Sequence, residues 1–152
     1  MKILNFGSLN IDHVYKLDQF VEPGETTACK DYQQFCGGKG LNQSVALSQA
    51  GAKVYHGGQI GVDGKMLKTF LEAKGVNTDF VTECTTPTGH AMIQVNNQGE
   101  NAIIISGGAN QKIDQDTIQK TITAFDAGDI LLLQNEINNT GQIITTAKKQ
   151  GM

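Results

Sequence analysis

The sequence predicts an α/β fold in which a parallel central sheet is covered by helices on both faces, with a second, smaller sheet beside it. Along most of the chain, apolar strand patterns alternate with segments whose apolar residues recur at helical spacing. Such alternation is typical of a parallel sheet enclosed by helices. Two stretches, about 13–36 and 88–106, contain strand patterns only. Because they interrupt the alternation, we expect them to form the smaller sheet.

The strands are expected in short apolar runs that are each followed by polar or turn residues. The first run is "KILNFGSLNID", which we interpret as a buried strand that ends in a polar turn. Later runs are "KVYHGGQIG", "DFVTEC" and "DILLLQNE". The segment "TGHAMIQVNNQGENAIIIS" predicts a hairpin with "NNQGEN" as its loop.

Four helices are predicted where apolar residues recur every three or four positions. The first covers about 41–49 and ends at "AGA", and the last is "NTGQIITTAKKQG". The second lies in "DGKMLKTFLEAKG", with Asp63 as the expected N-cap and Gly75 as the expected C-cap. The third, in "KIDQDTIQKTITAFDAG", is predicted from four apolar residues. These residues are Ile113, Ile118, Ile122 and Phe125.

Composition excludes several classes of protein. The chain has 152 residues, 39% of them apolar and 18% charged, which is enough for one globular domain with its own core. A net charge of −3 without a block of Lys or Arg argues against nucleic acid or a membrane as partner. The longest aliphatic run, "ILLL", is too short to span a bilayer. Cys29, Cys36 and Cys84 lack metal-ligand spacing, so we expect reduced thiols, a cytoplasmic location and no metal site.

The stretch "FCGGKGLNQS" contains several glycines where a helix is expected to begin. Glycine destabilises a helix, so we expect these positions to require a backbone without a side chain. It is not a Walker A loop, because Gln33 and Gly40 stand where that motif needs Gly and Ser or Thr around Gly38 and Lys39. A dinucleotide fingerprint would need glycine in place of Gln43. The pattern favours a ligand that closely approaches backbone N–H groups at a helix N-terminus. A tight turn that caps the helix is the alternative.

Polar side chains also follow two of the expected strands. Asn10 and Asp12 come after the first strand, and their spacing of two allows both to face one side. Glu136 follows "ILLLQ". Ligands of open parallel sheets bind beyond the carboxyl ends of the strands, where carboxylate and amide groups suit a polyhydroxylated ligand. The alternative is a local Asx turn at Asn10 and Asp12 and a solvated charge at Glu136.

Five motifs occur in an order and spacing that resemble a known family. They are "GSLNID", "PGET", "GGKGLNQSVALSQAGA", "GGAN" and "LLLQNE". Together they resemble the N-terminal half of PfkB carbohydrate kinases, and in detail the ribokinase-type members. The resemblance covers essentially the whole chain. It implies a ribokinase-like three-layer α/β/α fold in which the two β-only stretches form a lid. That lid closes over a sugar and often pairs with a second lid in a homodimer.

The resemblance also implies the residues that bind the sugar. Hydroxyl groups would be bound from the first strand end, the glycine stretch and the third strand end. The residues concerned are Asn10, Ile11, Asp12, Gly38, Lys39, Gly40, Leu41, Asn42 and Glu136. The reaction implied is ATP-dependent phosphorylation of D-ribose to D-ribose 5-phosphate.

In this family the general base, the ATP pocket with Mg²⁺ and a site for a monovalent cation such as K⁺ belong to the C-terminal half. We therefore expect no catalytic residue among residues 1–152, and we expect these residues alone to be inactive as a kinase. Two alternatives remain open. One is a sugar-binding or self-associating module without catalysis, and the other is a kinase of the same family that acts on another sugar or a nucleoside.

Overall fold

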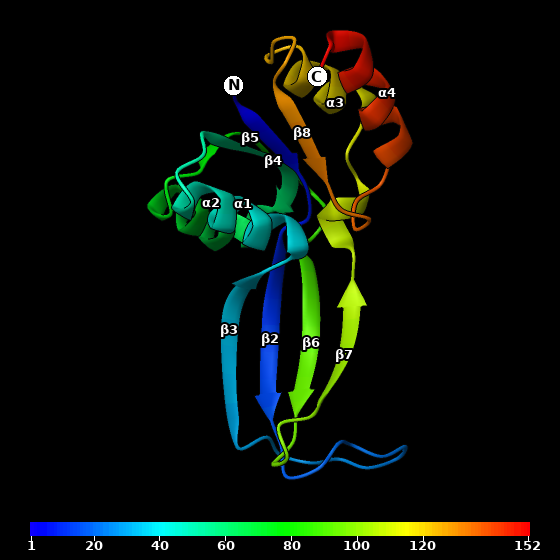
Figure 1. Ribbon diagram of the computed structural model, residues 1–152. Coiled ribbons are helices and arrows are strands. Elements are labelled where there is room, and N and C mark those ends of the chain that lie inside the picture. Colours follow the sequence, from blue (N-terminus) through cyan, green and yellow to red (C-terminus); the bar gives the residue numbers. More distant parts are fainter.

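The computed structural model describes residues 1–152 and contains two four-stranded sheets (Figure 1). The main sheet is entirely parallel and has the strand order β5-β4-β1-β8. Its strands are β1 (Ile3–Phe6), β4 (Val54–Gly61), β5 (Asn77–Cys84) and β8 (Ile130–Leu133). The predicted run "DFVTEC" is part of β5, at the edge of this sheet.

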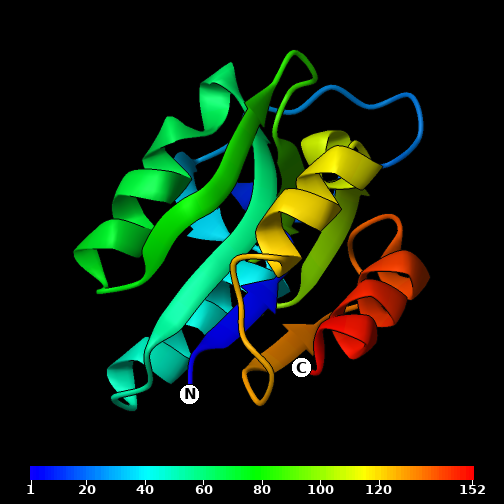
Figure 2. The same ribbon diagram turned by 90° about the horizontal axis from the view of Figure 1, so that it is seen from above.

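Helices cover both faces of the main sheet, so the predicted three-layer α/β/α arrangement is confirmed (Figure 2). Two helices lie on one face, namely α1 (Lys39–Gln49) and α2 (Lys65–Ala73). Two lie on the other, namely α3 (Gln115–Ile122) and α4 (Thr140–Gln150). Short 3₁₀ turns follow β4 and β7, namely η1 (Val62–Gly64) and η2 (Gly108–Gln111). No helix has the length and apolar character that crossing a membrane would need.

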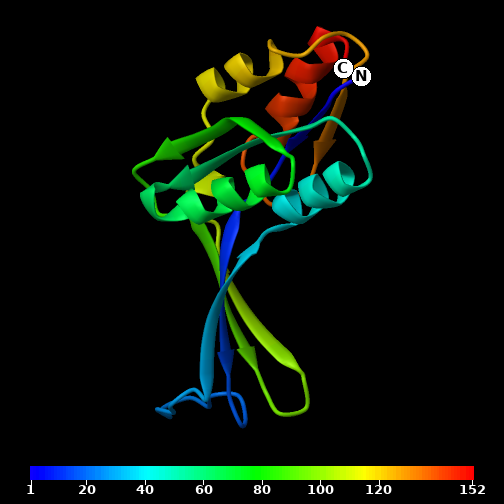
Figure 3. The same cartoon turned by 90° about the vertical axis from the view of Figure 1, so that its left-hand side faces the viewer.

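The second sheet extends away from the main sheet and its helices (Figure 1, Figure 3). Its strand order is β3-β2-β6-β7, with a parallel pair at the centre and an antiparallel strand on each side. The strands are β2 (Asn10–Lys16), β3 (Asp31–Gly37), β6 (Gly89–Val95) and β7 (Asn101–Ser106). The two central strands enter this sheet from the main body, and the two outer strands lead back from it into α1 and η2.

Each face of the main sheet has its own apolar core. On the side of α3 and α4, Leu4 and Phe6 of β1 pack against the apolar residues predicted for the third helix, of which Ile118 and Ile122 lie in α3 and the other two flank it. All four of these residues are buried. They are Ile113, Ile118, Ile122 and Phe125. On the side of α1 and α2, Leu41 and Leu67 pack against Val54 and Ile60 of β4. Full burial of one such side chain contributes about 1.5–3 kcal/mol, so both layers stabilise the sheet.

Three local predictions differ from the structure. The C-cap of α2 is Lys74 and not the predicted Gly75; Gly75 follows it with a φ of 78°, and Val76 N donates to Leu71 O at 3.1 Å, which closes the helix end. Asp63 is not the N-cap of α2: that position is Gly64, and the Asp63 carboxylate instead accepts hydrogen bonds from Thr88. The prediction of a polar turn after the first strand is also wrong. The chain passes from β1 through only three residues, 7–9, into β2, so Asn10 begins a strand.

A buried polar network joins α1 to the main sheet. Asn5 Nδ2 donates to Gly40 O at 2.7 Å and to Ser44 Oγ at 2.8 Å. Ser44 Oγ lies 2.8 Å from His56 Nδ1, and His56 Nε2 lies 3.2 Å from Gly7 O. These partners fit a neutral imidazole that donates from Nε2 and accepts at Nδ1. Burial disfavours the charged ring and lowers the pKa of His56 to about 4, against a weaker opposite effect of Gly7 O.

This lowered pKa predicts that the fold loses stability in mild acid. The unfolded chain takes up a proton at His56 near its ordinary pKa of 6.5, whereas the folded chain does so only near pH 4. Stability from this group is therefore complete above pH 6.5 and falls as the pH falls towards 4. Between pH 6.5 and 5, the free energy of unfolding should fall by about 2 kcal/mol.

Urea unfolding at several pH values in this window measures the effect. His56→Gln should abolish the slope, whereas His13→Gln should preserve it because His56 is still present. An equal slope in the wild type and in His56→Gln would contradict the assignment of the buried neutral imidazole.

Candidate functional site

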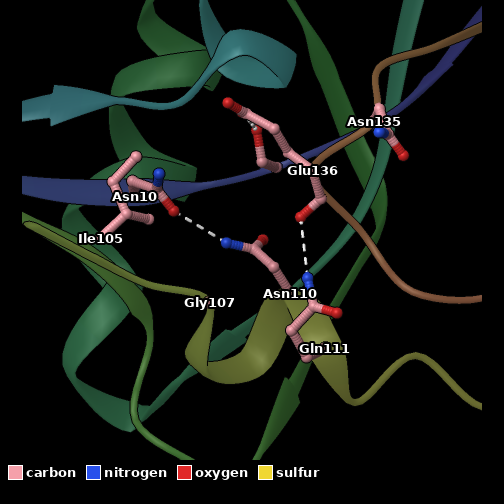
Figure 4. A pocket seen from close by; sticks show the side chains of 8 residues that line it. Asn10, Ile105, Gly107, Asn110, Gln111, Asn135 and Glu136 are labelled. Carbon is pink, nitrogen blue, oxygen red and sulfur yellow. Dashed lines mark hydrogen bonds between the residues drawn. The ribbon is translucent and has the colours of Figure 1, made fainter.

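A cavity of about 310 Å³ opens where the second sheet meets the carboxyl edge of the main sheet (Figure 4). Seven of its eight lining residues are polar or glycine. The lining comprises Ser8, Asn10, Ile105, Gly107, Asn110, Gln111, Asn135 and Glu136. The main sheet contributes through the segments that follow β1 and β8, whose carboxyl ends lie side by side because the strands are parallel. Hydroxyl and amide groups with one carboxylate suit a small ligand rich in hydroxyl groups.

The carboxylate of Glu136 is held by the start of α1. Ser8 Oγ donates to Glu136 Oε2 at 2.6 Å, and Lys39 N donates to the same atom at 3.2 Å. Lys39 Nζ forms an ion pair with Glu136 Oε1. Partial burial opposes ionisation, but the hydrogen bonds from Lys39 and Ser8 outweigh it, so the pKa of Glu136 is lowered. Glu136 is thus the anion at the positive end of this helix.

The other free N–H groups of α1 are also bound within the chain. Gly40 N donates to Ser8 Oγ at 3.2 Å, and Leu41 N donates to Ser8 O at 3.0 Å. Asn42 N donates to Gly38 O at 3.0 Å, which is the first bond of the helix itself. In this structure the helix N-terminus therefore binds residues of its own chain.

The sequence suggests that the glycines around Lys39 make room for a ligand, but the structure gives a different reason for them. A Cβ atom on Gly40 would lie 2.4 Å from Ser8 N, and one on Gly38 would lie 2.8 Å from Ser8 O. Gly38 also has a φ of 100°, which favours glycine. These atoms are backbone and cannot move aside like the end of a side chain. The glycines allow the chain to approach itself, so the turn alternative accounts for them without a ligand.

Asp12 differs from Glu136 in its surroundings. It lies on the same face of β2 as Asn10, and no group of the chain donates a hydrogen bond to its carboxylate. Glycine at position 37 leaves room for it, since a Cβ there would lie 2.1 Å from Asp12 Oδ2. Burial, helped by the charge of Glu136 and opposed by His13, raises the pKa of Asp12. Its oxygens therefore remain free to accept hydrogen bonds beside the cavity.

The structure brings together only some of the predicted site residues. Asn10 and Glu136 line the cavity, and Asp12 and Lys39 lie next to them. The side chains of Ile11 and Leu41 belong to the apolar core, so only their backbone could contact a ligand. Asn42 is exposed and does not line the cavity.

Six lining residues were not among the predicted site residues. They are Ser8, Ile105, Gly107, Asn110, Gln111 and Asn135. The motif "GGAN" was the available signal for Gly107 and Asn110, and "GSLNID" and "LLLQNE" include Ser8 and Asn135. The turn η2 also supports Glu136, because Gln111 Nε2 donates to Glu136 O at 3.0 Å (Figure 4).

Metal ligands are absent from this arrangement. No group of three or more His, Cys, Asp and Glu side chains in the chain could hold a metal ion. The cavity offers hydrogen-bonding groups to a polar ligand.

The three-layer α/β/α core with a projecting second sheet matches ribokinase structures. The chain belongs to the pfkB family of carbohydrate kinases, whose family model matches residues 1–151. Ribokinase of Haemophilus influenzae is 37% identical over 151 residues, which are 96% of this chain and 49% of that protein. Ribokinase of Bacillus subtilis is 36% identical over 136 residues, with 86% of this chain and 45% of that protein covered.

Solved structures agree with this assignment. The structure of Arabidopsis thaliana ribokinase complexed with ribose and ATP matches with a TM-score of 0.80 and 31% identity, over 99% of this chain and 51% of that chain. The structure of ribokinase from Cryptococcus neoformans in complex with ADP matches with a TM-score of 0.80 and 36% identity. The match covers 96% of this chain and 44% of that chain. The chain spans about half the length of the curated relatives it matches.

The glycine contacts predict a large difference between two alanine substitutions. Gly38 and Gly51 both have positive φ, at 100° and 87°, but a Cβ on Gly51 would meet nothing within 4 Å. Gly51→Ala should cost only the left-handed backbone conformation, about 1 kcal/mol. Gly38→Ala should cost at least about 1 kcal/mol more, because the methyl group collides with Ser8 O. Thermal and urea unfolding of the two variants measure this difference, and equal losses would contradict it.

Proposed function

We propose that this chain forms the sugar-binding part of a ribokinase-type kinase, which transfers the terminal phosphoryl group of ATP to O5 of D-ribose. The products are D-ribose 5-phosphate and ADP. The observation that carries the proposal is the polar cavity at the carboxyl edge of the main sheet, with the unpaired carboxylate of Asp12 beside it. Ribokinase relatives of 36–37% identity support the choice of ribose. Three unpaired cysteines agree with a cytoplasmic location.

The residues present would bind and orient the sugar. A ribose hydroxyl held at the start of β2 would accept a hydrogen bond from the Asn10 amide and donate one to Asp12. Both side chains lie on the same face of the strand, two residues apart. Glu136 would position the start of α1 through its bonds to Ser8 and Lys39. The remaining lone pairs of its carboxylate oxygens would accept hydrogen bonds from the sugar. Phosphoryl transfer depends chiefly on such positioning, so fixing the acceptor hydroxyl is this chain's contribution.

ATP binding and the general base are proposed to lie in the part of such a kinase that corresponds to the remaining length of the relatives. When bound, ATP supplies the phosphoryl group, and Mg²⁺ neutralises charge on its phosphates. None of the residues discussed above has a role in that step. Another sugar is the main alternative, because deoxyribokinase of Salmonella typhi is 32% identical over 158 aligned residues.

We further propose that the second sheet is a lid that pairs with a second copy of itself. Six large apolar side chains of this sheet are at least 45% exposed: Tyr32, Phe35, Met92, Ile103, Ile104 and Ile105. The strand register places Phe35, Ile103 and Ile105 on the face that also carries Asp12. Because Ile105 lines the cavity, this apolar face is continuous with the site. An exposed apolar face of this kind marks an interaction surface.

The sugar site predicts that Asp12→Asn and Glu136→Gln have opposite effects on stability. Asp12→Asn should leave the melting temperature unchanged or raise it, because the raised pKa shows that the ionised carboxylate is disfavoured in the fold. The same change should weaken D-ribose binding about ten- to a hundredfold, because a hydrogen bond to a carboxylate is lost. Glu136→Gln should cost about 1–3 kcal/mol of stability, because bonds from Ser8 and Lys39 to a charged group are lost.

Titration calorimetry with D-ribose and thermal unfolding of the 152-residue chain measure these effects. Absence of D-ribose binding at millimolar concentration would refute a sugar site made by this chain. If Asp12→Asn lowered stability without weakening binding, the role assigned to Asp12 would be wrong.

The proposed lid contact predicts that two adjacent substitutions behave differently. Ile103 and Ile104 are both exposed, but they lie on opposite faces of β7. Ile103→Lys should convert a dimer to a monomer, because it places a charge in the apolar contact. Ile104→Lys should leave the dimer intact. Light scattering at tens of micromolar measures the mass, and a monomeric wild type or equal effects of both variants would refute the contact.

A further inference from the structure

The buried side chain of Asn110 forms the two backbone hydrogen bonds that a neighbouring strand would otherwise form with Leu9. Asn110 lies in η2 and is only 2% exposed. Its Oδ1 accepts from Leu9 N at 3.0 Å, and its Nδ2 donates to Leu9 O at 3.1 Å. One side chain thus satisfies both backbone groups of Leu9, the residue that leads into β2. The backbone at the start of β2 is therefore fixed by a residue 101 positions away in the sequence.

The same side chain also determines how Asn10 is oriented. Asn110 Nδ2 donates to Asn10 Oδ1 at 2.8 Å (Figure 4). The oxygen and nitrogen of an amide project in different directions, so a bound Oδ1 turns Nδ2 of Asn10 away from Asn110. No group of the chain accepts a hydrogen bond from that Nδ2, although Asn10 is only 7% exposed and lines the cavity. The cavity therefore receives a hydrogen-bond donor at this position.

A glycine on the neighbouring strand leaves the space for this contact. Gly89 of β6 lies opposite Asn10 in the register of the second sheet. A Cβ at this position would lie 2.1 Å from Asn110 Nδ2 and 2.4 Å from Asn10 Oδ1. Any side chain here would thus break the bond between the two amides. The contact therefore requires β2, β6 and η2 to pack closely together at this point.

We propose that Asn110 is a positioning residue of the sugar site, which holds the Asn10 amide so that its amino group faces the cavity. The proposal rests on the sugar-binding function proposed above. A hydroxyl oxygen of the sugar accepts from Asn10 Nδ2, and its proton is donated to Asp12. If the Asn10 amide turned over, two acceptors would face this hydroxyl, which has only one proton to donate.

Asn110→Asp tests the orientation directly, because the new side chain has the same shape but lacks the amino group. The Asn10 amide is then expected to turn over and donate to the new carboxylate. In ¹⁵N-labelled chain, the Asn10 side-chain NH₂ signal, assigned by its loss in Asn10→Asp, should shift and exchange more slowly with solvent. An unchanged Asn10 signal would overturn the proposal, whether or not the chain binds sugar.

D-ribose affinity, measured by calorimetry on the same variants, tests the consequence. Asn110→Asp should weaken binding about tenfold or more, the effect of one lost hydrogen bond at a polar site. Asn138→Asp is the matched control, because the Asn138 side chain bridges the backbone N and O of Ile113 in the same way, at 3.1 and 3.0 Å, and does not line the cavity. It should lower the melting temperature comparably and leave the affinity unchanged. Equal affinity losses in both variants would show that Asn110 has only a structural role.

Asn10→Asp gives an independent test if Asn110→Asp does not fold. It retains an acceptor for Asn110 Nδ2 but replaces the amino group at the cavity with oxygen. The same loss of about tenfold in affinity is expected, and an unchanged affinity would overturn the proposal. If the wild type binds no D-ribose, the proposed function fails, and the Asn10 amide signal alone decides whether the orientation is correct.

Discussion

The site depends on how closely the start of α1 approaches the short connection between β1 and β2. Gly40 and Gly7 face each other across this contact, and a Cβ on Gly7 would lie 2.7 Å from the Cα of Gly40. The approach places Ser8 Oγ within 3.2 Å of Gly40 N and 2.6 Å of Glu136. One hydroxyl group thus joins a strand connection, a helix N-terminus and the segment after β8. The cavity lies at this junction, so its shape depends on a contact in which no side-chain carbon could be accommodated.

The two carboxylates that the sequence placed at the site have different physical roles. Glu136 accepts hydrogen bonds from Ser8 and Lys39 and is held in its charged form, which lowers its pKa. Asp12 is partly buried without such partners, and its pKa is raised. The hydrogen bonds that Glu136 accepts therefore come from its own chain, whereas the oxygens of Asp12 accept none from the chain. An unsatisfied acceptor next to a polar cavity is disfavoured in the fold unless a ligand donates to it.

The sequence predicts features that depend on local periodicity. The layers follow from the alternation of strands and helices, and Ile118 and Ile122 of α3 lie in the core as their helical spacing requires. Asn10 and Glu136 meet because parallel strands end at one edge. Periodicity does not predict that Asp63 binds Thr88, or that Asn110 binds Leu9, because these partners are 25 and 101 positions apart. Nor does it show whether a glycine faces a ligand or the chain itself.

The base of the second sheet is fixed to the main body at both of its central strands. At β6, Thr88 Oγ1 donates to Asp63 Oδ1 at 2.7 Å and accepts from Gly61 N at 2.9 Å. At β2, the amide of Asn110 satisfies both backbone groups of Leu9. Thr88 and Leu9 are fully buried, so water does not compete for these bonds. These bonds anchor the start of β2, so that Asn10 of the second sheet lines the same cavity as Glu136, which follows β8 of the main sheet.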